Sequence, residues 1–263
     1  MRIALGLEYD GAAFCGWQTQ PGGCGVQDHL QQALSSLAAE PIVVTAAGRT
    51  DTGVHAAAQV AHFDTEAERD DQGWIRGTNS SLHPSARVLW AARVPDDFHA
   101  RFSARARTYR YLLLNDPVDA GVLKGKVGWY HRPLDAKAIR EAMESLVGEH
   151  DFTSFRDAQC QAKSPVRDLR QARLEVRGNL LVFTFTANAF LHHMIRNLVG
   201  SLVYVGAGKH PVPWMRELLE ARDRRLAAPT FAPDGLYLAG IEYGSGFTLP
   251  PFRPNPLLEG LAP

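Results

Sequence analysis

Two hydrophobic periods follow one another at the start of the chain. Every second residue is apolar over positions 1–10, which predicts a β-strand. After Gly25 the apolar residues recur every three or four positions, which predicts an amphipathic helix that begins at Val26. Acidic side chains interrupt the first ten residues, so we expect a strand there and not a signal peptide.

A turn-rich segment over 48–55 lies between two strand-like runs, 42–47 and 59–63. It reads Gly-Arg-Thr-Asp-Thr-Gly-Val-His. Because glycine and short polar residues favour tight turns, we predict a loop between two strands.

Strands are also predicted over 87–94 and 103–114. In the longer one, Arg107, Tyr109 and Tyr111 share one face if the alternation holds. After a connector the pattern recurs. The elements predicted for the second half are a helix over 136–147, strands over 166–176 and 180–186, and a helix from His192.

These elements predict an α+β fold of two similar halves. Each half mixes strands and helices in a βαββ-like order, as in RRM-type and ferredoxin-like sheets, with antiparallel strands and helices on one face. We expect the active-site cleft between the halves. The predicted boundaries are 1–115 for the first half, 116–132 for a connector, 133–245 for the second half and 246–263 for a Pro-rich tail.

Composition indicates a globular protein of the cytosol. A hydrophobic share of 45% and a charged share of 21% allow a sizeable core. Cys15, Cys24 and Cys160 form an odd set without Cys-x-x-Cys spacing, so we expect reduced thiols and neither a disulfide framework nor a zinc site. The apolar stretch 198–208 is shorter than the roughly 20 residues that span a bilayer, so no membrane partner is expected.

The net charge of the chain is zero, but the charged residues are unevenly distributed along it. A net charge of zero and a pI near 7.2 argue on their own against a nucleic-acid partner. Residues 98–115, however, contain no acid, and the chain has 23 Arg against 5 Lys. Arginine suits bidentate phosphate contacts, although a general composition bias gives the same excess. The arginines of this stretch are Arg101, Arg105, Arg107 and Arg110.

The segment 48–56 also carries the candidate chemistry. Glycines on both sides of Thr-Asp-Thr allow a tight loop to hold the Asp51 carboxylate outward, as a nucleophile or a base. The structural alternative is a turn in which Asp51 only caps its own backbone.

The whole string 48–56 closely resembles the catalytic motif of TruA-type tRNA pseudouridine synthases. Thr52 departs from it, since alanine is more frequent there in the family, which affects the loop packing and not the assignment of Asp51. The resemblance extends through both halves. Its other segments are 7–11, 14–18, 59–63, 102–105, 107–111, 151–156, 190–200 and 233–238.

The resemblance implies an isomerisation of uridine to pseudouridine, without a cofactor or a metal. Asp51 would be the essential carboxylate, which either attacks the sugar or removes a ribose proton. Burial disfavours a charged carboxylate, and Arg196 matches the family arginine proposed to keep it ionised. Arg196 could instead extend from a helix face to solvent.

Other matched residues would bind the RNA. Tyr109 matches the tyrosine that stacks on the target base, although an alternating tyrosine is more often ordinary sheet packing. Arg49 is the candidate to fill the space of the flipped-out uridine, or it pairs with a phosphate. The residues expected at RNA phosphates are Arg101, Arg105, Arg107 and Arg110. A second group is expected there too, although its members could simply lie on a solvated surface: Arg222, Arg224 and Arg225.

Three histidines are interpreted as structural. His192 and His193 would point about 100° apart on a helix and form no joint metal pair. We interpret His55 as a histidine of the core or loop whose hydrogen bonds are made within the protein, and not as an acid or base. The resemblance further implies a homodimer and, as substrate, the tRNA anticodon stem-loop at positions 38, 39 and 40.

Two other functions fit parts of the pattern. Asp51-Thr52-Gly53 is also the triplet of aspartic peptidases, but these need two such carboxylates and the triplet occurs once. Such a peptidase would form its pair across a homodimer and leave the second-half motifs unexplained. An RNA-binding module without catalysis is the other alternative, because sheets with arginine and aromatic residues commonly bind RNA.

Overall fold

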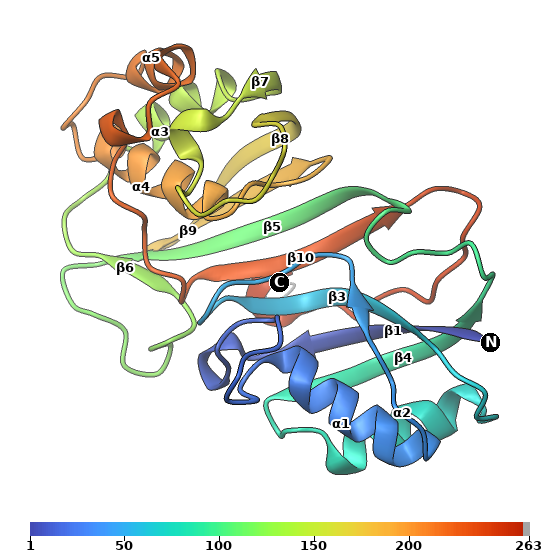
Figure 1. Ribbon diagram of the computed structural model, residues 1–263. Coiled ribbons are helices and arrows are strands. Elements are labelled where there is room, and N and C mark those ends of the chain that lie inside the picture. The colour runs from blue at the N-terminus through green and yellow to red at the C-terminus, as the bar shows by residue number, and fades with distance from the viewer. Residues whose placement is uncertain (260–263) are drawn as a thin grey trace. The chain divides into compact units, whose positions relative to one another are not determined.

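The computed structural model describes residues 1–259 and divides them into two compact units. The first unit combines residues 1–105 with 237–259, and the second is Ala106–Leu236. Each unit is a mainly antiparallel sheet with helices on one face, so the predicted α+β class is confirmed (Figure 1). The domain boundaries drawn from the sequence stay a prediction.

The sheet of the first unit has the strand order β4-β1-β3-β10, with β2 also paired to β3. Strand β1 is antiparallel to β3 and β4, whereas β10 is parallel to β3. Helices α1 and α2 lie on one face of this sheet (Figure 1). The bounds are β1 Arg2–Tyr9, α1 Val26–Ala38, β2 Thr45–Ala46, β3 His55–Asp64, α2 Asp71–Ser81, β4 Ala86–Val94 and β10 Leu236–Tyr243.

Alternation along β1 gives the sheet two different faces. Ala4 lies on the face opposite α1 and α2, and so does Gly6, whose Cβ, if it had one, would lie 2.1 Å from the Trp90 indole. Glycine is therefore required at position 6. By alternation Leu5 and Leu7, both fully buried, face the two helices.

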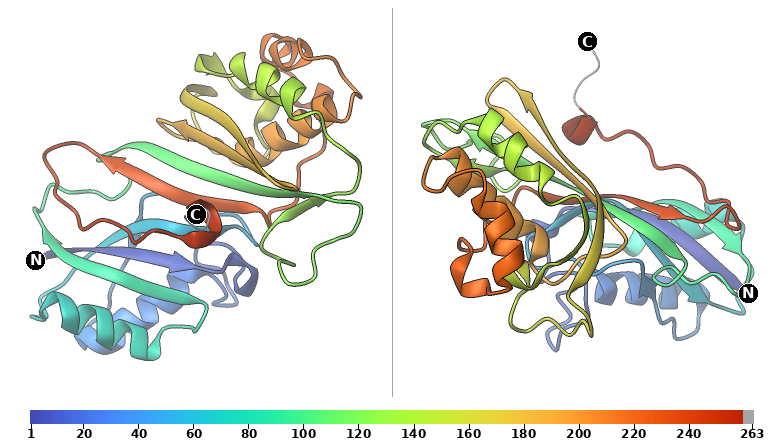
Figure 2. Two further views of the ribbon diagram at one scale, coloured as in Figure 1. Left: turned by 180° about the vertical axis from the view of Figure 1, so that it is seen from behind. Right: turned by 90° about the horizontal axis from the view of Figure 1, so that it is seen from above.

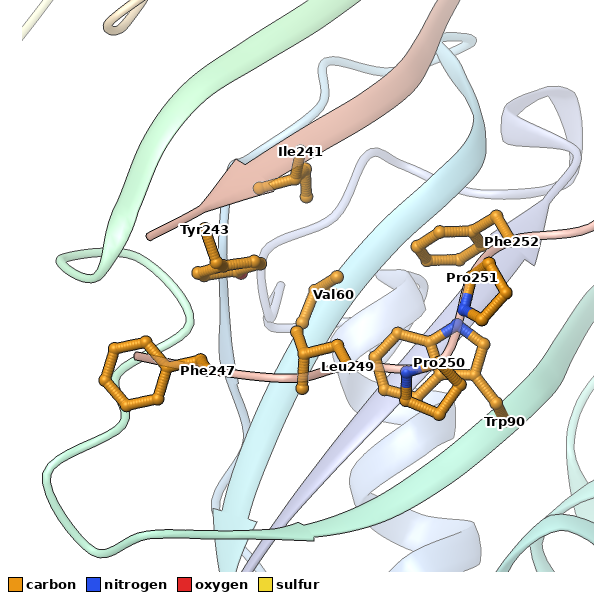
Figure 3. Close-up of a pocket in the computed structure, with 9 residues that line it drawn as sticks. All are labelled: Val60, Trp90, Ile241, Tyr243, Phe247, Leu249, Pro250, Pro251 and Phe252. Atoms are coloured by element: carbon orange, nitrogen blue, oxygen red, sulfur yellow. The ribbon is translucent and has the colours of Figure 1, made fainter. Parts of the chain in front are cut away.

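The C-terminal segment after β10 runs along the face opposite α1 and α2 (Figure 2). Phe247 packs edge-on against the buried Phe98 at 5.1 Å between ring centroids, and Phe252 lies 5.4 Å from Trp90. Between segment and sheet remains a partly open cavity of about 290 Å³ (Figure 3). Its lining residues are Val60, Trp90, Ile241, Tyr243, Phe247, Leu249, Pro250, Pro251 and Phe252.

The sheet of the second unit has the order β5-β9-β8-β7, with every neighbouring pair antiparallel. Strand β6 pairs with β5 in parallel. Helix α4, almost wholly buried, packs with α3 and α5. The bounds are β5 Ala104–Asn115, β6 Gly128–Tyr130, α3 Ala136–Glu144, β7 Gly148–Asp151, β8 Val166–Arg177, β9 Leu180–Ala187, α4 Met194–Gly206 and α5 Trp214–Ala221.

Short helices complete the described chain. The 3-10 helices are Gly11–Ala13, Thr153–Phe155 and Arg224–Leu226, and α6 is Pro256–Glu259. None of the helices in residues 1–259 is long and apolar enough to cross a membrane.

Most predicted elements are confirmed, while two elements and the state of the cysteines are corrected. The run 42–47 forms only the two-residue strand β2, because β2 pairs with β3 only at Thr45 and Ala46. The helix predicted from His192 begins at Met194. Cys15 and Cys24 are not free thiols, since they form a disulfide with Cα atoms 5.4 Å apart; Cys160 is a free thiol.

Candidate active site

The Asp51 loop, residues 48–54, connects the segment after β2 to β3. The Val54 N–H donates to the Asp51 carbonyl at 3.1 Å, and Gly53 adopts the left-handed backbone conformation with φ 79°. A side chain at position 53 would be strained, which explains the glycine. Asp51 is half-buried between the buried Thr50 and the exposed Thr52.

Buried polar side chains hold this loop against the sheet. The Tyr9 hydroxyl and Thr50 Oγ1 are 2.9 Å apart. Gln59 Nε2 donates to the Gly48 carbonyl at 2.7 Å and to the Tyr9 hydroxyl at 3.4 Å. Burial raises the pKa of Tyr9 to about 12, so its hydroxyl keeps its proton. The loop is therefore fixed to β1 and β3 on both sides of Arg49.

The segment 14–18 supports the loop from the other side. The Trp17 N–H donates to the Thr50 carbonyl at 2.9 Å. Gly16 has φ 94°, and a Cβ there would lie 2.9 Å from the same carbonyl. The Cys15–Cys24 disulfide joins the two ends of the following turn. Close packing at Gly16 thus places the segment directly against the backbone of Asp51.

His55 is buried at the start of β3, which agrees with the interpretation of it as a histidine of the core. It is 2% exposed and is the first residue of β3, not the last of the loop. Its Nδ1 accepts the Gly11 N–H at 3.1 Å, and its ring stacks on Tyr237 at 4.6 Å. Both contacts fix the start of β3, and so the end of the Asp51 loop.

Three of the predicted RNA-binding arginines also lie in the first unit. Arg49 is exposed in the same loop as Asp51. Arg101 and Arg105 are exposed in the turn before β5 and at its start.

Tyr109 lies in the second unit, on β5. It is 8% exposed and packs edge-on against Phe190 with 5.2 Å between the ring centroids. Arg107 and Tyr109 are paired with alternate residues of β9, which agrees with the predicted shared face. Arg107 Nη1 donates to the Asn188 carbonyl at 2.9 Å, whereas Arg110 falls on the other face by alternation.

Arg196 comes from the first turn of α4. Its Nε donates to the Phe231 carbonyl at 2.8 Å, and the Phe231 N–H donates back to the Arg196 carbonyl at 3.2 Å. Burial raises the pKa of Tyr111, Asp234 adds to the rise and Arg196 opposes it, so both charges act on this ring. The reciprocal bonds fix the guanidinium direction. Asp51 belongs to the first unit and Arg196 to the second, and their meeting in one cleft stays a prediction.

The paired histidines differ from the prediction. His192 and His193 precede α4, and His193 has φ 60°. Their rings stack at 4.0 Å and do not diverge by 100°, because neither residue has helical geometry. Asp157 lies 2.8 Å from His193 Nδ1 and 3.4 Å from His192 Nδ1.

The second arginine group is engaged with the protein. Arg224 donates to Asn197 Oδ1 at 3.0 Å and to the Ala228 carbonyl at 2.8 Å. Arg225 pairs with Asp223 at 2.6 Å. Phosphate contacts by these residues stay predictions.

Comparisons with known proteins agree with the motifs. A model of the family described as tRNA pseudouridine synthase matches residues 7–103 and 142–244. The tRNA pseudouridine synthase A of Methylobacillus flagellatus is 56% identical over 250 residues, which cover 95% of this chain and 96% of that relative. The proteins of the same name from Burkholderia mallei and Burkholderia thailandensis are 56% identical over 251 residues, 95% of this chain and 93% of each relative.

The chain belongs to the tRNA pseudouridine synthase family. It is accordingly an isomerase that converts uridine to pseudouridine in tRNA. Asp51 and Arg196 lie within the two matched segments, whereas Tyr109 lies between them.

Sequence reasoning missed the residues that hold the Asp51 loop. Tyr9, Gly16, Trp17 and Gln59 all fall in segments that resemble the family. Their spacing along the chain, however, gave no sign that they converge on one loop.

Proposed function

We propose that this chain isomerises uridines 38, 39 and 40 in the anticodon stem-loop of tRNA, with Asp51 as the essential carboxylate. The observation that carries the proposal is the Asp51 loop, whose backbone carbonyls are bonded by Trp17 and Gln59 and whose Thr50 hydroxyl is bonded to Tyr9. Catalysis requires a reacting group that is held in place before the substrate arrives. A turn in which Asp51 only caps its own backbone would need no such support.

The reaction breaks the bond from uracil N1 to ribose and forms a bond from uracil C5 to the same carbon. C5 releases its proton to water, and N1, which has lost its bond to the sugar, takes up a proton from water, so atoms and charge balance without a cofactor. Asp51 either attacks the sugar or removes a ribose proton, and both routes need the ionised carboxylate. Arg196 is proposed to keep Asp51 charged, and its guanidinium is suited to this because Phe231 fixes its direction.

The remaining predicted residues would bind the RNA. Tyr109 would stack on the target base, which tolerates a rotating ring better than a fixed hydrogen bond does. Arg49 would fill the space of the flipped uridine. Phosphates would be bound by Arg101, Arg105, Arg107 and Arg110. We further propose a homodimer in the cytoplasm, which light scattering tests through a mass near twice 28.9 kDa.

Tritium release from transcripts labelled at uracil C5 tests the catalytic proposal. Wild-type protein should release tritium, and the product should map to the anticodon arm. Asp51→Asn should lower kcat by at least about 1000-fold and leave the tRNA Kd within about 3-fold. Asp119→Asn, which removes an exposed carboxylate of the second unit, is the matched control and should keep full activity. An Asp51→Asn protein with wild-type turnover would refute the role of Asp51.

A further inference from the structure

We infer that Phe102 is a fixed platform on which an unpaired base of the tRNA, other than the isomerised uridine, stacks. Of the exposed large apolar side chains in residues 1–259, only Phe102 and Trp129 are aromatic, with 76% and 38% of their surface accessible. A large ring at this exposure costs free energy in water unless something covers it in use. The inference rests on the tRNA reaction of the family.

The ring is already backed on one side. His99 stacks under Phe102 with 4.3 Å between the ring centroids and 30° between the planes. The Arg101 guanidinium lies over the ring with its Cζ 5.6 Å from the centroid. This distance is longer than in a close stacking contact. Because Arg101 is exposed, its side chain can move with an incoming base.

The turn that carries the ring is held firmly. His99 Nδ1 accepts the N–H groups of Arg101 and Phe102, each at 3.2 Å. Ser103 Oγ accepts the His99 N–H at 2.9 Å, and the Ser103 N–H donates to the His99 carbonyl at 2.9 Å. Burial and nearby Arg2 lower the pKa of His99, so its Nδ1 remains an acceptor at neutral pH.

The base of the turn is fixed to the sheet. The Ala100 N–H donates to His62 Nδ1 at 3.2 Å, and the Tyr243 hydroxyl donates to the Ala100 carbonyl at 2.7 Å. Phe98 is fully buried below it. An exposed aromatic ring on a rigid turn loses little entropy when it stacks, which favours binding.

The chemistry around the ring selects a nucleotide. An aromatic face with guanidinium groups beside it binds a ligand that is both flat and negatively charged. No acidic residue occurs from Phe98 to Asn115. Unpaired bases in RNA loops supply such a face next to a phosphate.

The test compares Phe102→Ala, Phe102→Trp and Phe102→Leu with Val122→Ala, which trims a 99% exposed valine elsewhere. Phe102→Ala should raise the tRNA Kd and KM by roughly 5-fold to 150-fold, the loss expected for one stacked base, with kcat and Tm unchanged. Phe102→Trp should bind within about 2-fold of wild type, because a larger ring still stacks. Phe102→Leu should resemble Phe102→Ala, because it keeps apolar surface without an aromatic face.

Other outcomes overturn the inference. Phe102→Ala with the Kd of Val122→Ala would exclude a stacking role. A changed mass of Phe102→Ala in light scattering, with unchanged tRNA affinity, would assign the ring to a protein contact. Wild-type protein that binds tRNA but releases no tritium would refute the proposed catalysis, while the Kd comparison would still decide the role of Phe102.

Discussion

Tyr9 joins the Asp51 loop to the sheet through a single hydroxyl. Tyr9→Phe removes its bonds to Thr50 and Gln59, both buried, and should lower the free energy of unfolding by about 1 to 3 kcal/mol. Because the backbone next to Asp51 then loosens, kcat should fall by about 10-fold or more. Tyr243→Phe loses one comparable hydroxyl bond, to Ala100, and should cost similar stability with unchanged kcat. Equal kcat values for both variants would contradict the positioning role.

Arg196 is distinguished from a simple positive charge by its geometry. The arginine donates through Nε to the Phe231 carbonyl and keeps its two terminal nitrogens for another partner. A lysine has a single ammonium group and lacks this planar fork of donors. We therefore expect Arg196→Lys to lower kcat by about 10-fold to 100-fold with little change in tRNA Kd. Arg216→Lys, at an exposed position of α5, is the control and should be neutral. Full activity of Arg196→Lys would mean that only its charge matters.

His62 makes the stability of the first unit depend on pH. Burial, together with the charges of Arg2 and His99, lowers its pKa to about 4, against about 6.5 in an unfolded chain. Between these values the unfolded state binds the extra proton, so stability falls as the pH drops through this window. Linkage predicts a loss of about 2 kcal/mol at pH 5 relative to pH 7. Urea unfolding at both pH values measures it, and His62→Gln should show a smaller difference.

The role of Asp51 could be proposed from the sequence, because the nine-residue string 48–56 resembles the family motif. The supporting contacts could not be predicted, since Tyr9 and Gln59 meet the loop only after β1 and β3 have paired. The positive φ of His193 could not be predicted either, because only a few per cent of non-glycine residues adopt that conformation.

At the level of elements, the disulfide between Cys15 and Cys24 braces the segment that supports the Asp51 loop. A bridge across nine positions should contribute about 2 to 3 kcal/mol, mainly by restricting the unfolded chain. Reduction should therefore lower the midpoint of unfolding and reduce kcat. The double variant Cys15→Ser/Cys24→Ser should unfold alike with and without dithiothreitol. An unfolding midpoint of the wild-type protein that is the same with and without dithiothreitol would contradict this expectation.

Elements were predictable where the hydrophobic period was clear, as in β1 and α1. Helix α2 was missed because its sequence contains two glycines and several short polar residues that disfavour helices. It forms through tertiary packing of its buried Trp74 and Thr78, and Gly77 leaves room for Leu37, whose side chain would lie 2.6 Å from a Cβ there. Strand β7 was missed because Gly-Glu-His-Asp has no apolar alternation.

For the whole molecule, the fold class followed from the pattern, whereas the path of the C-terminal segment did not. Strand β10 returns to the first unit and pairs in parallel with β3, where Tyr237 meets His55, 182 positions earlier in the sequence. Hydrophobic periods carry no information about which sheet a late strand joins. The first unit is therefore completed only after the second has been synthesised.

The C-terminal segment should accordingly be a condition of stability for the first unit. Removal of residues from Gly246 onward would expose Phe98 and Trp90, which Phe247 and Phe252 cover. Loss of two packed aromatic side chains should cost about 3 kcal/mol or more and promote aggregation. Arg253→Ala, which breaks only a surface pair with Glu8, should cost less than about 1 kcal/mol. Urea unfolding separates the two, and a truncated chain as stable as the full one would show that the sheet face needs no cover.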